Sequence, residues 1–119
     1  MCHGNTDDAV HGVCMISADG RHIVHSHGGQ PGFLTDQYNL PAHLAVDNDE
    51  FIFVVDMFNC RVTLLSPTLD YVRQVVSRDQ LKWWPWCVYL DTQKRFMYVA
   101  DNERKDGKFT AGRVVVFSV

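Results

Sequence analysis

The chain consists of short apolar runs separated by short polar segments that are rich in Asp, Asn, Gly and Pro. The clearest run is Phe51-Ile-Phe-Val-Val-Asp56, and Arg61-Val-Thr-Leu-Leu-Ser66 follows it almost at once. Runs of Val, Ile, Phe and Tyr that are bounded by turn-forming residues predict strands. The first run is apolar at consecutive positions, which is typical of a strand buried on both faces, as in a sheet that lies between two other sheets. The pattern therefore predicts an all-β fold.

One unit of this pattern contains four strands. They are expected at residues 43–46, 51–55, 61–65 and 71–76, with turns at 48–49 and 66–70, where turn-forming residues gather. The expected burial pattern is that Val54, Val55, Val99 and Ala100 are buried while Asn48, Asp49 and Glu50 are exposed.

The pattern recurs later in the chain. Pro41 and Pro85 are 44 residues apart, and the same offset aligns Asp47 with Asp91. If one extra residue is allowed in the second unit, residues 51–56 align with residues 96–101. After a further insertion in the second unit, residues 61–66 align with residues 113–118. Residues 12–17 match this last segment as well. Self-similarity at such a period indicates repeated supersecondary units. Units of four strands whose sheets stack face to face are the blades of a β-propeller, so the sequence predicts a partial β-propeller of four-stranded antiparallel blades.

Two motifs of the middle unit resemble the NHL repeat: Pro41-x-x-Leu44-x-Val46-Asp47, and Val54-Val55-Asp56-x-x-Asn59-x-Arg61-Val62. Segments 28–32 and 37–39 are similar to the glycine-rich linker between NHL blades, so the resemblance runs from about residue 12 to residue 119. It is closest to the C-terminal propellers of tripartite-motif ubiquitin ligases (the TRIM-NHL type). The last unit departs from the pattern at 103–111, and Gly12 stands where the first unit would have its arginine.

The resemblance implies a six-bladed parent propeller. Residues 1–119 are then one NHL fragment, with the end of one blade at 12–27, a complete blade at 39–76 and a C-terminal blade without its fourth strand at 83–119. Because a ring needs about four to eight blades, we expect a C-terminal piece of a longer protein whose remaining blades are its partners. Alone, it should self-associate through exposed strand edges and apolar faces.

The polar residues that recur with the repeat are predicted to be structural, because aspartate and asparagine satisfy turn amides and arginine bridges to carboxylates. They are Pro41, Asp47, Asp56, Asn59, Arg61, Pro85, Asp91, Asp101 and Arg113. No nucleophile with a matching base stands out, so we expect no catalytic residue and no cofactor.

Binding is expected at one end of the blades. Since strands alternate in direction, the long connections 27–42, 57–60, 77–86 and 102–112 share one rim, and long irregular loops on a rigid scaffold often bind ligands. The candidate binding residues there are Tyr38, Phe58, Arg78, Lys82, Trp83, Trp84, Arg104, Lys105 and Lys108. Aromatic residues and arginine are the usual anchors of interfaces, although the tryptophans also fit a packing role between blades.

Two kinds of ligand fit these residues. The resemblance implies that the chain is a non-catalytic platform that binds a protein or a single-stranded RNA. It also implies that this platform is the substrate-recognition part of a ubiquitin ligase, whose catalytic activity would lie in another part of the protein. Aromatic stacking beside Lys and Arg suits RNA. However, acidic residues are interleaved with these cations and favour a solvated surface of mixed charge: Asp79, Asp101, Glu103 and Asp106. The alternative is a fragment of a propeller lyase or lactonase with a metal ion in the central channel.

The composition of the chain limits the partners and the cellular compartment that are expected. The net charge of −3 does not attract nucleic acid or anionic membranes globally, and no apolar run is long enough to span a membrane. Cys2, Cys14, Cys60 and Cys87 include no C-x-x-C pair, and the polar start does not resemble a signal peptide. We therefore expect reduced thiols in the cytoplasm, although a secreted chain without its start would look the same.

Histidine and cysteine residues near the start of the chain are candidate metal ligands. His22, His25 and His27 lie close together in the sequence, with Cys2 and His3 upstream. Their spacing matches no closed zinc motif, so no metal is expected.

Overall fold

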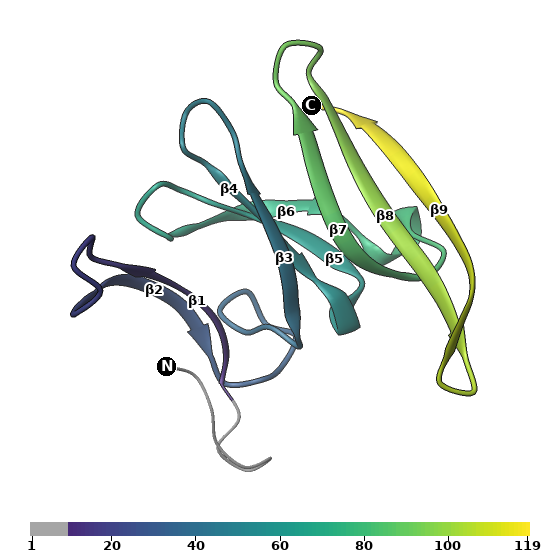
Figure 1. The fold of residues 1–119 in the computed structure, drawn as a ribbon, viewed down its shortest axis with the longest axis horizontal. Coiled ribbons are helices and arrows are strands. Elements are labelled where there is room, and N and C mark those ends of the chain that lie inside the picture. The colour runs from purple at the N-terminus through teal and green to yellow at the C-terminus, as the bar shows by residue number, and fades with distance from the viewer. Residues whose placement is uncertain (1–9) are drawn as a thin grey trace.

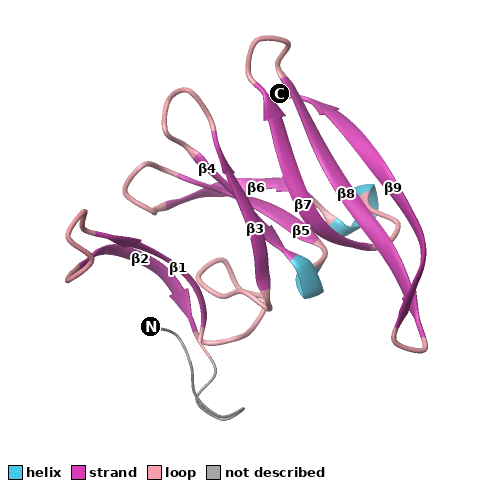
Figure 2. Ribbon diagram, in the orientation of Figure 1, coloured by secondary structure: helices cyan, strands magenta, loops and turns pink. Residues whose placement is uncertain are grey.

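The computed structural model describes residues 10–119, which form nine strands in three antiparallel sheets (Figures 1 and 2). The N-terminal sheet contains β1 (His11–Ile16) and β2 (Ile23–Gly29). The middle sheet contains β3 (Pro41–Val46), β4 (Ile52–Asp56), β5 (Arg61–Leu65) and β6 (Tyr71–Val76). The C-terminal sheet contains β7 (Trp84–Asp91), β8 (Phe96–Lys105) and β9 (Lys108–Ser118).

The predicted all-β class is confirmed. The only helical segments among the described residues are two single 3-10 turns, η1 (Met57–Asn59) and η2 (Arg78–Gln80). The four strands of the middle sheet are hydrogen-bonded in chain order, and their limits agree with the sequence prediction to within two residues. Within the described range, no helix is long and apolar enough to cross a membrane.

Strand β4 of the middle sheet is covered on both faces, as its continuous apolar run predicts. On one face Ile52 and Val54 pack with Tyr38, next to Val13 and Met15 of β1. On the other face Phe53, Val55 and Val62 pack against Val88, Met97 and Val99 of the C-terminal sheet. Because two separate cores meet at β4, consecutive residues of this strand all lose contact with water.

The predicted burial is confirmed at Val54, Val55 and Val99, of which at most 1% is exposed, and the turn residues 48–50 are exposed. The prediction for Ala100 is wrong, because this residue is only half-buried. Val99 and Ala100 point to opposite faces of β8. The face that carries Val99 packs on the middle sheet, whereas the face that carries Ala100 has no sheet over it among the described residues.

The middle and C-terminal sheets share one strand register. Both first strands have a register shift directly after their proline, and the pairs then match position by position. The matching pairs are Pro41–Asp56 and Pro85–Asp101, His43–Val55 and Cys87–Ala100, and Asp56–Arg61 and Asp101–Arg113. Even the left-handed backbone recurs, at Glu50 (φ 68°) and Arg95 (φ 60°) before the second strands. The repeat in the sequence is therefore also a repeat of the backbone.

The prediction of an irregular loop at the insertion 103–111 is wrong. Strands β8 and β9 continue through it as a hairpin, with Arg104 opposite Phe109 and Lys105 opposite Lys108. The hairpin turns at Asp106 (φ 53°) and Gly107 (φ 76°). Asp-Gly with two positive φ angles is the favoured two-residue turn, because its twist matches that of the strands. This dipeptide is the signal in the sequence that would have predicted the hairpin.

Candidate binding rim

The connections between strands gather at two ends of the sheets. Segments 30–40, 57–60 and 77–83 and the tip of the β8–β9 hairpin lie at one end, which is called the long-connection rim below (Figure 1). The turns at 47–51, 66–70 and 92–95 lie at the other end, the short-turn rim. This division follows from the antiparallel order of the strands in each sheet.

A buried ion pair fastens the longest connection of the rim. Arg61 Nε donates to Asp56 Oδ2 at 2.8 Å, and the two side chains are 10% and 0% exposed. The other guanidinium nitrogens of Arg61 donate to the carbonyl oxygens of Phe33 (2.7 Å), Leu34 (3.0 Å) and Gln37 (2.6 Å). A planar guanidinium can hold several acceptors at once. Arg61 therefore fixes the shape of segment 33–37.

Aspartate and asparagine complete this fastening. Asp56 Oδ1 accepts the backbone N–H of Asn39 at 2.7 Å, and Asn59 Nδ2 donates to Gly32 O (2.6 Å) and to Asp56 Oδ2 (2.9 Å). The carboxylate of Asp56 thus joins the end of β4 to the segment that enters β3. These contacts stabilise the connection.

The C-terminal sheet repeats half of this arrangement. Asp101 Oδ2 accepts the backbone N–H groups of Lys82 (3.0 Å) and Trp83 (3.2 Å), and Arg113 Nε donates to both of its carboxylate oxygens at 3.2 Å. The side chain of Arg113 is 41% exposed, against 10% for Arg61. Arg113 therefore holds fewer neighbouring groups in place than Arg61 does.

An aromatic hollow lies beside this second ion pair. Its volume is about 210 Å³, and its lining residues are Cys60, Lys82, Trp83, Trp84, Asn102, Glu103 and Arg104. The ring of Phe58 meets that of Trp84 edge to face, with 5.0 Å between the centroids. Phe58 is 37% exposed and Trp84 is 39% exposed. Two partly exposed rings beside charged groups are typical of interface anchors.

Trp83 is held in place by its neighbours. Its Nε1 donates to Glu103 Oε2 at 2.9 Å, Lys82 Nζ lies 4.9 Å from the ring centroid, and Arg113 Cζ lies 5.9 Å from it. Hydrogen bonds from Thr110 first, and then from Trp83, hold the pKa of Glu103 below its ordinary value. The hollow therefore keeps a negative charge among its cations.

The structure separates the predicted binding residues into groups. Phe58, Lys82, Trp83, Trp84 and Arg104 lie at the aromatic hollow. The exposed side chains of the hairpin lie next to it: Lys105 Nζ is 3.5 Å from Glu103 Oε1, Lys108 lies near the tip, and Arg104 Cζ is 5.5 Å from the ring of Phe109. Arg78 lines a different depression, with Phe33, Asn59 and Asp79.

The prediction that Tyr38 is a binding residue is wrong. Its side chain is 0% exposed and lies in the core between the middle and N-terminal sheets. Its hydroxyl lies 2.9 Å from His27 Nδ1 and 3.4 Å from Thr63 Oγ1. Gly28 makes room for the ring, because a Cβ at Gly28 would lie 2.8 Å from Tyr38 Cδ2. A buried ring cannot meet a ligand, so Tyr38 belongs to the core.

Cys60, Asn102 and Glu103 line the hollow but are not among the predicted binding residues. In the sequence Glu103 is one of the acidic residues that weaken the case for RNA, and Cys60 and Asn102 lie in segments that are predicted to be loops. The Asp-Gly turn would have placed Glu103 on a paired strand, near the tryptophans. Nothing in the local sequence indicates Cys60, whose left-handed conformation (φ 52°) ends η1.

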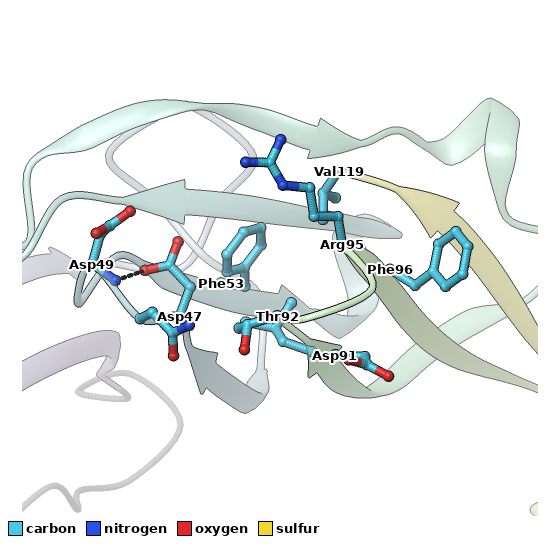
Figure 3. A pocket seen from close by; sticks show the side chains of 10 residues that line it. Asp47, Asp49, Phe53, Asp91, Thr92, Arg95, Phe96 and Val119 are labelled. Carbon is cyan, nitrogen blue, oxygen red and sulfur yellow. Dashed lines mark hydrogen bonds between the residues drawn. The ribbon is translucent and has the colours of Figure 1, made fainter.

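A second hollow opens on the short-turn rim between the middle and C-terminal sheets. Figure 3 shows it, with Phe53 from β4 and Arg95 from the β7–β8 turn, and its volume is about 320 Å³. Its carboxylates cap turns: Asp47 Oδ1 accepts the N–H groups of Asp49 and Phe51, both at 2.9 Å, and Asp91 Oδ1 accepts that of Lys94 at 3.1 Å.

Over residues 10–119, no three His, Cys, Asp or Glu side chains lie close enough together to hold a metal ion. Among the candidate histidines, His27 contacts Tyr38 rather than a second metal-ligating side chain. Cys2 and His3 lie outside the described residues.

The side chain of His27 in β2 packs against the core that contains Tyr38. Its ring lies edge-on to Tyr38 and stacks against Tyr71, with centroids 5.4 Å and 6.2 Å away. Burial is the main cause that lowers the pKa of His27 below the ordinary 6.5, and the positive charge of Arg61 adds to it. The carboxylates of Asp36 and Asp70 oppose the shift. The neutral form of His27 is thus the one that the fold favours.

This burial predicts a pH dependence of stability. Because the unfolded chain binds a proton on His27 more readily than the folded chain, the contribution of His27 is complete above pH 6.5 and is lost as the pH falls through the lower folded value. Urea unfolding at about pH 7.5 and about pH 5.5 measures this loss. The His27→Gln variant should lose less stability between these pH values, whereas the exposed control His22→Gln should behave like the wild type. Equal losses in His27→Gln and the wild type would contradict the assignment.

A scan of the chain against protein-family models finds no match, and no curated protein matches it.

Proposed function

We propose that the chain forms blades of an NHL-type β-propeller and that its long-connection rim is a non-catalytic platform that recognises a protein. The observation that carries the binding role is the pair of partly exposed rings, Phe58 and Trp84, beside a hollow of mixed charge. The propeller is supported by two apolar surfaces that the described sheets leave uncovered.

The first uncovered surface is the outer face of the C-terminal sheet. Tyr89 is 64% exposed, Val114 is 60% exposed and Val116 is 51% exposed. The positions aligned with them by the repeat are Ala45, Val62 and Leu64, which pack between the middle and C-terminal sheets. The C-terminal sheet thus repeats the packing face of the middle sheet without a sheet to cover it. Another sheet of the same kind would complete this packing, as in a propeller.

The second uncovered surface lies over β3. Leu44 is 46% exposed and Val46 is 52% exposed. The aligned residue Val88 is 2% exposed, and Leu90 is partly buried. The N-terminal sheet has only two strands, and its contact with β3 leaves Leu44 and Val46 exposed, whereas the middle sheet covers Val88. Two further strands beside β1 would cover Leu44 and Val46.

A protein fits the rim better than RNA does. Lys82 and Arg113 already lie over the ring of Trp83, and Glu103 keeps its negative charge close by. A carboxylate at this place repels phosphate, whereas exposed aromatic rings with charges of both signs are common at protein interfaces. The ligase role rests on the resemblance alone: in a tripartite-motif protein, this rim would select the protein to be ubiquitinated.

The test compares substitutions on the two rims of the full-length protein. Partners captured from a lysate are identified by mass spectrometry, and the strongest one is purified and titrated. Replacing a central aromatic anchor costs an interface about 2 kcal/mol or more, so Trp84→Ala and Phe58→Ala should each weaken binding at least about tenfold. The controls on the short-turn rim are Lys94→Ala and Arg95→Gly, in which glycine suits the positive φ of residue 95. They should bind like the wild type.

An RNA ligand would give a different result. A fluorescent oligouridine would then bind the wild type, and Lys82→Ala with Arg104→Ala would weaken its binding and flatten the dependence on salt. That result, without any effect of Trp84→Ala on a protein partner, would contradict the proposal. Loss of binding only from changes at Lys94 and Arg95 would refute the assignment to this rim.

A further inference from the structure

Among the described residues, two leucines have a left-handed backbone, and their side chains lie in different surroundings. They are Leu40 (φ 63°) and Leu69 (φ 65°). This conformation is unfavourable for leucine, because its Cβ comes too close to the following carbonyl oxygen. Leu69 is 2% exposed and packs in the core that contains Tyr38, so its burial offsets the strain. Leu40 is 41% exposed and belongs to neither of the two apolar cores.

The backbone of Leu40 is held in this conformation from both sides. Its N–H donates to His11 Nδ1 at 2.8 Å, and its carbonyl oxygen accepts the N–H of Met57 at 3.1 Å. Leu40 also directly precedes Pro41, and a residue before proline prefers an extended backbone. Asparagine or glycine would make the same backbone hydrogen bonds with less strain. Neither core packing nor the backbone therefore explains a leucine at this position.

The repeat aligns Leu40 with Trp84. Each of these residues directly precedes the proline in the first strand of its sheet. Trp84 is 39% exposed although the middle sheet, which packs beside β7, has all four of its strands. Further strands in the N-terminal sheet would by the same geometry leave Leu40 accessible. Its exposure is thus a property of the repeat position.

Leu40 also adjoins the aromatic pair of the long-connection rim. The N–H of Phe58 donates to the carbonyl oxygen of Asn39 at 3.0 Å, next to the bond between Met57 and Leu40. The ring of Phe58 in turn meets that of Trp84. The turn η1 therefore connects Leu40 to Trp84, and three partly exposed apolar residues follow one another across the rim.

We propose that Leu40 is a second apolar anchor of the long-connection rim and contacts the same partner protein as Phe58 and Trp84. The inference rests on the proposed function, because the partner is the protein that the rim recognises. This partner must present apolar side chains to two neighbouring sheets, since Leu40 precedes the middle sheet and Trp84 belongs to the C-terminal sheet. An aliphatic side chain offers no ring to stack on a base and no donor to a phosphate, so Leu40 fits a protein rather than RNA.

The experiment measures stability and binding in the same variant of the full-length protein. Asparagine adopts the left-handed conformation more readily than leucine, so Leu40→Asn should have a urea midpoint equal to or above that of the wild type. Its binding to the partner purified in the comparison of the two rims should weaken about fivefold or more, the loss that marks an interface anchor. Leu40→Met keeps an apolar side chain and should restore most of the affinity.

Leu69→Asn is the matched control for the strain, because it makes the same change in the same backbone conformation at a buried position. Its urea midpoint should fall, since a buried amide without partners is unfavourable. A urea midpoint of Leu40→Asn below that of the wild type would overturn the inference, because Leu40 would then be a structural residue.

The binding data separate this inference from the function on which it rests. Unchanged binding in Leu40→Asn, together with weaker binding in Trp84→Ala, would overturn the role of Leu40 and leave the proposed function in place. Unchanged binding in both variants would overturn the inference and the proposed function together.

Discussion

Replacing Val54 by aspartate in the full-length protein is expected to abolish folding. Val54 is 1% exposed and packs with Ile52, Leu65 and Tyr38 in the core between the middle and N-terminal sheets. The residues that pack with Val54 in this cluster carry no positive charge that could pair with a new carboxylate. Burying an unpaired polar or charged group costs several kcal/mol, and whole domains are stable by only about 5–15 kcal/mol. The variant should therefore appear in the insoluble fraction, or lack a cooperative unfolding transition by circular dichroism.

Val72→Asp is the matched control for this prediction. Val72 belongs to β6 of the same sheet, but it is 44% exposed, so an aspartate there can remain in water. The control chain should be soluble and unfold close to the wild-type temperature. If the Val54→Asp chain is soluble and native-like, the assignment of β4 as a strand covered on both faces is wrong.

Replacing Arg61 by alanine is expected to destabilise the protein far more than the aligned change Arg113→Ala. Without Arg61, the buried carboxylate of Asp56 loses its cation, and three carbonyl oxygens of segment 33–37 lose their donors. Removing one partner of a buried ion pair typically costs about 3–5 kcal/mol. Arg113 is 41% exposed, and Asp101 keeps two backbone N–H donors without it, so we expect a loss nearer about 1 kcal/mol.

Urea unfolding of the full-length protein measures both losses under the same conditions. The two variants make the same chemical change at aligned positions, so each controls for the other. Arg61→Ala should also loosen segment 33–37, which faster amide hydrogen exchange there would reveal. A larger loss from Arg113→Ala than from Arg61→Ala would show that burial of the ion pair does not decide its contribution.

Much of the fold follows from local patterns in the sequence. The consecutive apolar residues of 51–55 predict a strand without an exposed face, and the structure places a sheet on either side of it. The repeat of 44 residues predicts that the second unit copies the first, and the matching strand registers agree. These predictions succeed because alternation, turn residues and repeats are properties of neighbours in the chain.

Other features depend on which surfaces meet. Ala100 continues an apolar run as Val55 does, yet it is half-buried because no sheet covers its side of β8 among the described residues. Tyr38 stands between polar residues, yet it is buried because the missing side chain of Gly28 leaves space for its ring. In both cases the burial of the residue depends on what packs against it from another part of the chain, and the local sequence does not reveal that neighbour.

The sequence by itself determined the all-β class, the four strands of the middle sheet and the turn residues between them. Only the tertiary structure decided which side chains from distant segments meet: Trp83 with Glu103, Phe58 with Trp84, and His43 with Cys87. The physical reason is that strand formation depends on residues a few positions apart, whereas these contacts depend on how the middle and C-terminal sheets pack and how a hairpin folds back. Such geometry is fixed by the sum of many weak contacts across the sheets, and no short stretch of the chain encodes it.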